Sequence, residues 1–373
     1  MNLNNVVSER LDLLRGLAAQ CVLVEHMLTY SGFSEVFIGS FGVVIFFVLS
    51  GFLIHHNTLT NHQRYGELFL ETYMMKRFFR VFTLYIPVVI LCFMTDITLQ
   101  HFVLPLEQKV NENARIQNFF GSFLMLQQNP WSEVGAQIFG VDAVNLKPYG
   151  SARPLWTVAI EWWIYVAYGI AASVYYGYSR APRMLSSVGF LFVFSMSIVA
   201  FNAISGIGNN LSLIWALGAL VAHFFVKLDD SKISGKQGTI YAAMFLLLGL
   251  FFLRIFHMNW SSIYRIVDPY DFVNAIIFSG LFAAFLIKSP VKMEILRWRY
   301  IAKLVANLSY PLYLSHFTVL SVFYGLGWFE DVSFTNYFVI FGASNCVAFL
   351  LYHLIDKHHG ALRVAFSKRF LVR

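Results

Sequence analysis

Charged residues are scarce in this chain. Asp, Glu, Lys and Arg together make up 13% of the 373 residues, whereas 58% are hydrophobic. A water-soluble domain carries about a quarter charged residues, so this composition excludes a soluble globular fold. It also excludes an intrinsically disordered chain. The composition indicates a protein that is solvated mainly by lipid.

Cysteine is also rare. The three cysteines are Cys21, Cys92 and Cys346, and each lies inside an apolar stretch. An odd number of buried thiols without a CxxC pair excludes a disulfide scaffold, and we expect no metal site. No linker or charge block divides the sequence either, so we expect a single membrane domain over residues 1–373.

Long hydrophobic runs are abundant. A transmembrane helix needs ~20 mostly apolar residues, and ten such runs are centred near residues 20, 46, 89, 166, 193, 218, 247, 279, 314 and 346. A long polar connection covers residues 100–153. We therefore expect an all-α polytopic membrane protein with about ten transmembrane helices.

The basic residues divide unequally between the two sides of these helices. With the N-terminus inside, 21 of the 27 Lys and Arg residues fall on the cytoplasmic side and 6 on the outer side. The positive-inside rule then predicts that both termini are cytoplasmic and that residues 100–153 are extracytoplasmic. The basic cytoplasmic face favours phosphate-bearing ligands. No basic soluble module with interleaved aromatic residues is present, so we expect no nucleic-acid partner.

Few ionisable residues fall within the predicted spans, where each costs at least ~2.5 kcal/mol. His26 lies in the first span, Glu161 in the fourth and His316 in the ninth, at comparable depths. A carboxylate and an imidazole at matched depth form a possible acid/base couple. The alternative is that each histidine is a packing residue, hydrogen-bonded to a neighbouring helix or a backbone carbonyl.

Three arginines lie at the predicted cytoplasmic ends of spans. Arg15 lies eleven residues before His26, which places the two on one helical face. Arg77 and Arg80 are three residues apart and also share a face. Paired guanidinium groups bind phosphate or diphosphate through bidentate contacts. The alternative is that these arginines mark the cytoplasmic flank or anchor lipid headgroups.

Ser50 and Gly51 interrupt a run of large apolar residues in the second predicted span. Small residues at such positions usually allow two helices to pack closely. A serine nucleophile is the alternative, but no GxSxG pattern surrounds Ser50. We therefore favour the packing interpretation.

Five segments, in this order, resemble the membrane domain of the acyltransferase 3 family of bacterial and eukaryotic O-acyltransferases. They are the R-x10-H pattern from Arg15 to His26, GVVIFFVLSGF at 42–52, the Arg77 and Arg80 pair, PLWTVAIEWWIY at 154–165 and NLSYPLYLSH at 307–316. The resemblance covers almost the whole chain. It implies an enzyme that takes an acyl group, commonly acetyl, from cytoplasmic acyl-CoA and transfers it to a hydroxyl of a glycan or glycolipid.

The resemblance also implies roles for individual residues. The expected catalytic residues are His26, Glu161 and His316, with His26 as general base, and the expected acyl-CoA-binding residues are Arg15, Arg77 and Arg80. The chain departs from many relatives at Trp162 and Trp163, which follow Glu161 where those relatives carry a second acid and an amide. An acyl-histidine intermediate is an alternative to direct transfer.

Further expectations follow from this resemblance. We expect acyl-CoA as donor substrate and no separate cofactor, a location in the cell inner membrane, and no soluble extracytoplasmic hydrolase-like domain. The main rival is a proton-coupled transporter or flippase, because intramembrane His and Glu residues also form proton relays. The sequence shows no clear internal repeat and no matching pair of broken helices, which are typical of transporters. A non-catalytic sensor is a third alternative.

Overall fold

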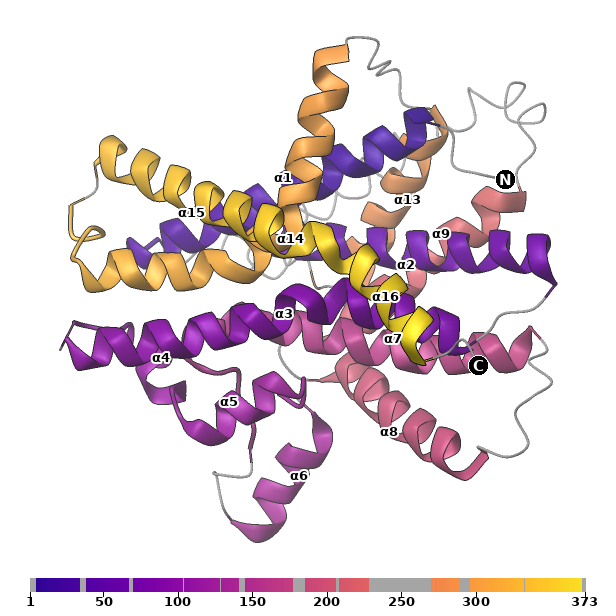
Figure 1. Ribbon diagram of the computed structural model, residues 1–373, viewed down its shortest axis with the longest axis horizontal. Coiled ribbons are helices and arrows are strands. Elements are labelled where there is room, and N and C mark those ends of the chain that lie inside the picture. The colour runs from indigo at the N-terminus through magenta and orange to yellow at the C-terminus, as the bar shows by residue number, and fades with distance from the viewer. Residues whose placement is uncertain are drawn as a thin grey trace. The chain divides into compact units, whose positions relative to one another are not determined.

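A computed structural model shows helices joined by turns and loops, with no strand among the residues that it describes (Figure 1). The described residues are 5–33, 38–66, 70–102, 104–127, 129–140, 145–176, 185–205, 208–227, 270, 272–288, 296–331 and 333–370. The chain divides into two compact units. The boundary between them falls inside α1 (Asn5–Tyr30), α14 (Leu296–Gly325) and the last turn of α8 (Leu185–Ile204), so each of these helices contributes to both units.

Several of the described helices are long and apolar enough to cross a membrane. These are the five stretches Ile38–Tyr65, Leu70–His101, Gly150–Tyr175, Ser187–Ile204 and Phe334–Arg369, and Leu211–Val226 and Val273–Phe285 are shorter apolar helices. The expected all-α polytopic membrane fold is confirmed. Nine of the ten predicted span centres fall on described helices, and the one near residue 247 lies outside the described residues. The number of ten spans stays a prediction, and α1 and α14 are not among the five because polar residues interrupt them.

The first unit comprises Met1–Cys21, Phe37–Gly66 and Asn202–Ala306. In it α2 (Ile38–Tyr65) packs along α9 (Leu211–Lys227), which also packs against α13 (Phe272–Lys288).

Glycines allow α2 and α9 to approach closely. A Cβ atom on Gly51 would collide with the backbone carbonyl of Trp215, and one on Gly218 would collide with that of Val48. The indole N–H of Trp215 donates a hydrogen bond to Ser50 Oγ at 3.1 Å. Close backbone contact of this kind needs small residues. The structure thus confirms the packing interpretation of Ser50 and Gly51.

The second unit comprises Val22–Val36, Glu67–Phe201 and Asn307–Arg373. Its central helix α3 (Leu70–His101) packs against α7 (Trp156–Tyr175), where a Cβ on Gly169 would collide with the Tyr73 ring. The chain continues through α8 (Leu185–Ile204) and, after α14, through α15 (Phe334–Leu354), η5 (Asp356–His358) and α16 (His359–Phe370). Helix α16 returns to pack against α3.

The polar connection predicted at residues 100–153 is folded into short helices next to α3 (Figure 1). They are α4 (Gln108–Asn113), α5 (Ile116–Phe123), α6 (Pro130–Phe139) and η2 (Gly150–Leu155). Glu107 caps α4 by accepting from Val110 N at 3.1 Å, and Asn129 caps α6 by accepting from Ser132 N at 2.9 Å. Such caps satisfy the free N–H groups at a helix start. Both α4 and α5 pack against η2, so these three short helices contact one another through η2.

Candidate active site

The two histidines predicted as site residues meet in the second unit. His26 lies one turn before the end of α1, and His316 lies in α14. Their imidazole rings stack with centroids 5.3 Å apart and an interplanar angle of 20°. The Phe317 ring meets His26 edge-on at 5.3 Å. Residues 290 positions apart in sequence thus form one pair, whereas the sequence placed them only at comparable depth.

The surroundings of His316 fix its tautomer. The side chain is 1% exposed, and its Nδ1 lies 3.0 Å from the carbonyl oxygen of Leu312. A carbonyl oxygen only accepts hydrogen bonds, so Nδ1 carries the proton and Nε2 carries a lone pair. Nε2 is buried and has no hydrogen-bond partner among the described residues. The pair therefore contains a nitrogen that is able to accept a proton.

A network at the start of α7 supports His316 from one side. The Tyr313 and Thr157 hydroxyls are 2.5 Å apart, and Thr157 donates to the Pro154 carbonyl at 3.1 Å. The Tyr313 ring lies 5.9 Å from the His316 ring. This network joins the PLWT segment to the SYPLYLSH segment, so two of the family-like motifs meet at the histidine pair.

Arg153 is a charged neighbour of the pair that the sequence reasoning missed. Its guanidinium carbon lies 5.9 Å from the centroid of the Phe317 ring, which itself meets the His26 ring edge-on. Glu107, the cap of α4, forms an ion pair with Arg153 at 3.7 Å. Arg153 is one of only six basic residues assigned to the outer side, and it directly precedes the PLWT motif. Its position next to that motif was the sequence feature that indicated a role near the site.

Buried hydrogen bonds hold η2, and with it Arg153, in place. Asp96 is unexposed, and its Oδ2 accepts from Ser151 N at 2.8 Å. Gly150 adopts φ of +33°, and a Cβ atom there would collide with that Asp96 oxygen. Glycine is therefore required at this position. Burial, followed by the nearby Asp96 charge, raises the pKa of the Tyr149 phenol, which stays protonated.

Tyr30 adds a hydroxyl to the same region. Its oxygen lies 3.0 Å from Ser321 Oγ, and its ring packs against Phe317 at 5.3 Å and against Phe329 at 5.3 Å. The charges of Glu107 and Arg153 also act on this hydroxyl. The neighbours of the histidine pair in this region are therefore aromatic rings, hydroxyl groups and one ion pair.

Glu161 has a hydrogen-bond partner on its own helix. It accepts a hydrogen bond from the hydroxyl of Tyr165, one turn further along α7, and its charge acts on Tyr73. Among the described residues, the His316 and Phe317 rings pack against His26, and Arg153 lies against the same Phe317 ring. The structure therefore pairs His26 with His316 and associates Glu161 with tyrosines.

Arg77 and Arg80 lie in different environments despite their shared helical face. Arg80 Nη1 lies 3.0 Å from both carboxylate oxygens of Asp356, which is 2% exposed, and its guanidinium covers the Tyr310 ring at 5.1 Å. Asp356 therefore balances the Arg80 charge.

The Arg77 guanidinium lies 5.8 Å from the Tyr73 ring centroid and 5.9 Å from that of Tyr165. Its Nε is buried without a hydrogen-bond partner among the described residues. No carboxylate in the described part of the chain forms an ion pair with it within 4 Å. Arg77 is thus the better placed of the two arginines to bind an anion.

Arg15 belongs to the first unit. Its guanidinium donates to Asp12 at 2.9 Å, three residues earlier in α1, and both side chains are partly exposed. It lies on the same helix as His26, as the sequence pattern requires. Among the described residues, no group of three His, Cys, Asp or Glu side chains lies close enough to hold a metal ion.

Comparison with known proteins identifies the family of this chain. The model of the acyltransferase 3 family, described as an acyltransferase domain, matches residues 8–353. A stretch of 178 residues is 28% identical to the peptidoglycan O-acetyltransferase OatA of Listeria monocytogenes, covering 48% of this chain and 26% of that protein. The match thus spans about a quarter of that relative's length. No solved structure matches the chain significantly. The family match covers all the motifs that surround the histidine pair, and the chain therefore belongs to the acyltransferase 3 family of membrane acyltransferases.

Proposed function

We propose that this protein is an O-acyltransferase that moves an acyl group from cytoplasmic acyl-CoA to a hydroxyl of a glycan or glycolipid acceptor. The observation that carries the proposal is the stacked pair of His26 and His316, in which the buried His316 has an unpartnered Nε2, in a chain of an acyltransferase family. Acyl transfer to a hydroxyl needs a base at the reacting oxygen.

In the proposed reaction, His26 acts as general base and His316 as its proton-holding neighbour. The acceptor oxygen attacks the thioester carbonyl as its proton passes to the imidazole. The tetrahedral intermediate then loses the CoA sulfur, and the imidazole returns the proton to the thiolate. Two stacked imidazolium cations would repel each other, so the pair carries at most one extra proton at a time.

Arg153 is the cation available to stabilise the oxyanion of the tetrahedral intermediate. It lies next to Phe317, whose ring meets the His26 ring edge-on, and its own partner Glu107 is 3.7 Å away, a long ion pair. A preorganised positive charge near a developing oxyanion is commonly worth several kcal/mol of transition-state energy in a site that excludes water. The partial exposure of Arg153 reduces that contribution.

Arg77 is proposed to bind the phosphate groups of the donor, and Arg80 to support it. The tyrosine rings beside Arg77 fix its side chain without neutralising it, whereas Asp356 neutralises Arg80. Arg15 is proposed as a further phosphate contact, on the position of its family motif. Glu161 is proposed to keep Tyr165 and its neighbours in position.

The acetyl group is the proposed acyl group, and a glycan is the proposed acceptor. The name of the OatA relative, a peptidoglycan O-acetyltransferase, supports both assignments, although the match covers only part of each chain. The excess of basic residues on one side supports an inner-membrane location with both termini in the cytoplasm.

The test is binding and turnover of radiolabelled acetyl-CoA by the purified protein. His26→Ala should retain acetyl-CoA binding and lose turnover, because the histidine acts only in the chemical step. Arg77→Gln should lose binding. Folded wild-type protein that binds no acyl-CoA would contradict the proposal and favour the transporter alternative.

A further inference from the structure

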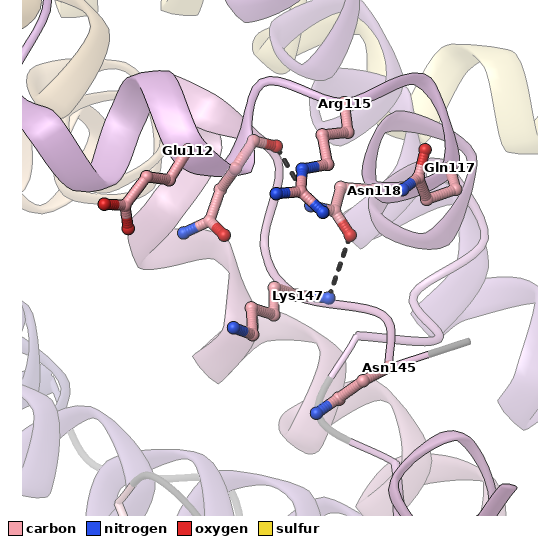
Figure 2. Close-up of a pocket in the computed structure, with 7 residues that line it drawn as sticks. Glu112, Arg115, Gln117, Asn118, Asn145 and Lys147 are labelled. Atoms are coloured by element: carbon pink, nitrogen blue, oxygen red, sulfur yellow. Dashed lines mark hydrogen bonds between the residues drawn. The ribbon is translucent and has the colours of Figure 1, made fainter. Parts of the chain in front are cut away.

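A polar pocket lies in the connection at residues 100–153, apart from the histidine site. It has a volume of about 180 Å³, the space of about six water molecules at ~30 Å³ each. Its walls come from the end of α4, the start of α5 and the chain before η2 (Figure 2). The seven lining residues are all polar: Glu112, Asn113, Arg115, Gln117, Asn118, Asn145 and Lys147.

Asn118 preforms this pocket. It is 3% exposed, and its amide donates to the Asn113 carbonyl at 3.0 Å while accepting from Lys147 N at 3.1 Å, as the dashed lines in Figure 2 show. Leu146 packs against Gly121 of α5, where even a Cβ atom would be crowded. The walls are therefore tied together before a ligand arrives, which reduces the entropy cost of binding.

The lining favours a small polar ligand with a negative charge. Arg115 and Lys147 contribute two positive charges, and Glu112 contributes one negative charge that already accepts from Gln108 at 2.8 Å. The amides of Gln117 and Asn145 add both donors and acceptors, which suit hydroxyl groups. Arginine and lysine bind carboxylate and phosphate through charge-assisted hydrogen bonds.

The pocket shares its scaffold with the histidine site. Lys147 and Arg153 are only six positions apart, and an extended chain of that length spans at most ~20 Å. Arg153 in turn pairs with Glu107, the residue that caps α4, and Glu112 lies five residues further along. At ~1.5 Å per residue these two lie about 8 Å apart along the helix. A ligand of a few sugar units is long enough to reach both the pocket and Arg153.

We propose that this pocket is a subsite for a negatively charged sugar unit of the glycan acceptor. Arg115 and Lys147 bind its carboxylate or phosphate, and the amides bind its hydroxyl groups. A neighbouring sugar unit then presents its hydroxyl to the histidine pair. This inference rests on the proposed function, because it names the acceptor class of the same enzyme.

The test is calorimetric binding of defined sugars to the purified full-length protein. The carboxylate arm compares trigalacturonate with its neutral methyl ester, and the phosphate arm compares trehalose 6-phosphate with trehalose. Wild-type protein should bind a charged sugar at least tenfold more tightly than its neutral counterpart. The double variant Arg115→Gln, Lys147→Gln should lose that preference. Lys109→Gln, an exposed lysine of α4 outside the pocket, should keep it.

Three outcomes would overturn the inference. The first is equal binding of charged and neutral sugars by the wild type. The second is a preference for charged sugars that survives in the double variant. A third is a stronger interaction with phosphatidylglycerol vesicles than with either sugar that disappears in the double variant, since the pocket would then bind a lipid headgroup. Thermal unfolding of each variant verifies that it is folded.

The same preparations separate this inference from the proposed function. Acetyl-CoA binding without charged-sugar binding would refute the subsite and leave the acyltransferase proposal standing. Charged-sugar binding through Arg115 and Lys147 without acetyl-CoA binding would refute the acyltransferase proposal and leave a sugar site.

Discussion

Replacing Asp356 by Asn should destabilise the second unit, because it leaves the Arg80 charge without its partner. Arg80 Nη1 lies 3.0 Å from both carboxylate oxygens, and Asp356 is 2% exposed. Removing one partner of a buried ion pair costs ~3–5 kcal/mol. The Arg80 side chain is 33% exposed, so water screens part of that cost. We therefore expect a loss of about 1–3 kcal/mol and a fall in Tm of several °C.

The assay is a double-mutant cycle on detergent-purified protein, with Tm and acetyl-CoA affinity measured for Asp356→Asn, Arg80→Gln and the double variant. The coupling between the two sites should be at least ~0.5 kcal/mol, as expected for residues in direct contact. Arg77→Gln is the matched control, since it should lose acetyl-CoA affinity with little change in Tm. Additive effects at residues 80 and 356, or an unchanged Tm in Asp356→Asn, would refute the structural role of Arg80.

Three further predictions concern packing and the histidine site. Gly218→Ala should lower Tm, because the added methyl group overpacks the contact between α2 and α9 at a cost of ~1–3 kcal/mol. Gly189→Ala is the control, since nothing lies close to a Cβ atom there and its Tm should not change. Equal Tm values for the two variants would contradict the close helix contact. Arg153→Gln should lower kcat about tenfold through lost oxyanion stabilisation while acetyl-CoA affinity stays unchanged, and an unchanged kcat would exclude this role. Tyr313→Phe removes the hydroxyl contact with Thr157 and should lower the free energy of unfolding by about 1 kcal/mol. An unchanged free energy of unfolding would contradict that contact.

The histidine pair shows what hydropathy and helix geometry are able to predict. Each residue advances a helix by ~1.5 Å, so counting from the predicted ends placed His26 and His316 at comparable depth. Depth is a single coordinate, however, and it does not say which helices are neighbours around a bundle. Glu161 was assigned a similar depth, and the hydrogen bond that it accepts from Tyr165 follows from their spacing of four residues in one helix. That His316 lies against His26 follows only from the tertiary structure.

The arginines show the same limit. Spacing of three residues placed Arg77 and Arg80 on one face of α3, and Tyr73 contacts Arg77 from the same helix, but the ion-pair partner of Arg80 comes from elsewhere in the chain. Asp356 is 276 positions from Arg80, and no local pattern connects them. Arg153 was counted only as an outer basic residue, because its proximity to His26 depends on the buried Asp96 contact that holds η2.

The measurement that tests the central claim most directly is single-turnover acetyl transfer by wild type, His26→Gln, His316→Gln and the double variant. Residues that act as one catalytic unit are strongly non-additive. Each single substitution should therefore reduce the rate nearly as much as the double substitution, while acetyl-CoA affinity stays near that of the wild type. A near-normal rate in either single variant, or independent and additive losses, would contradict catalysis by the histidine pair.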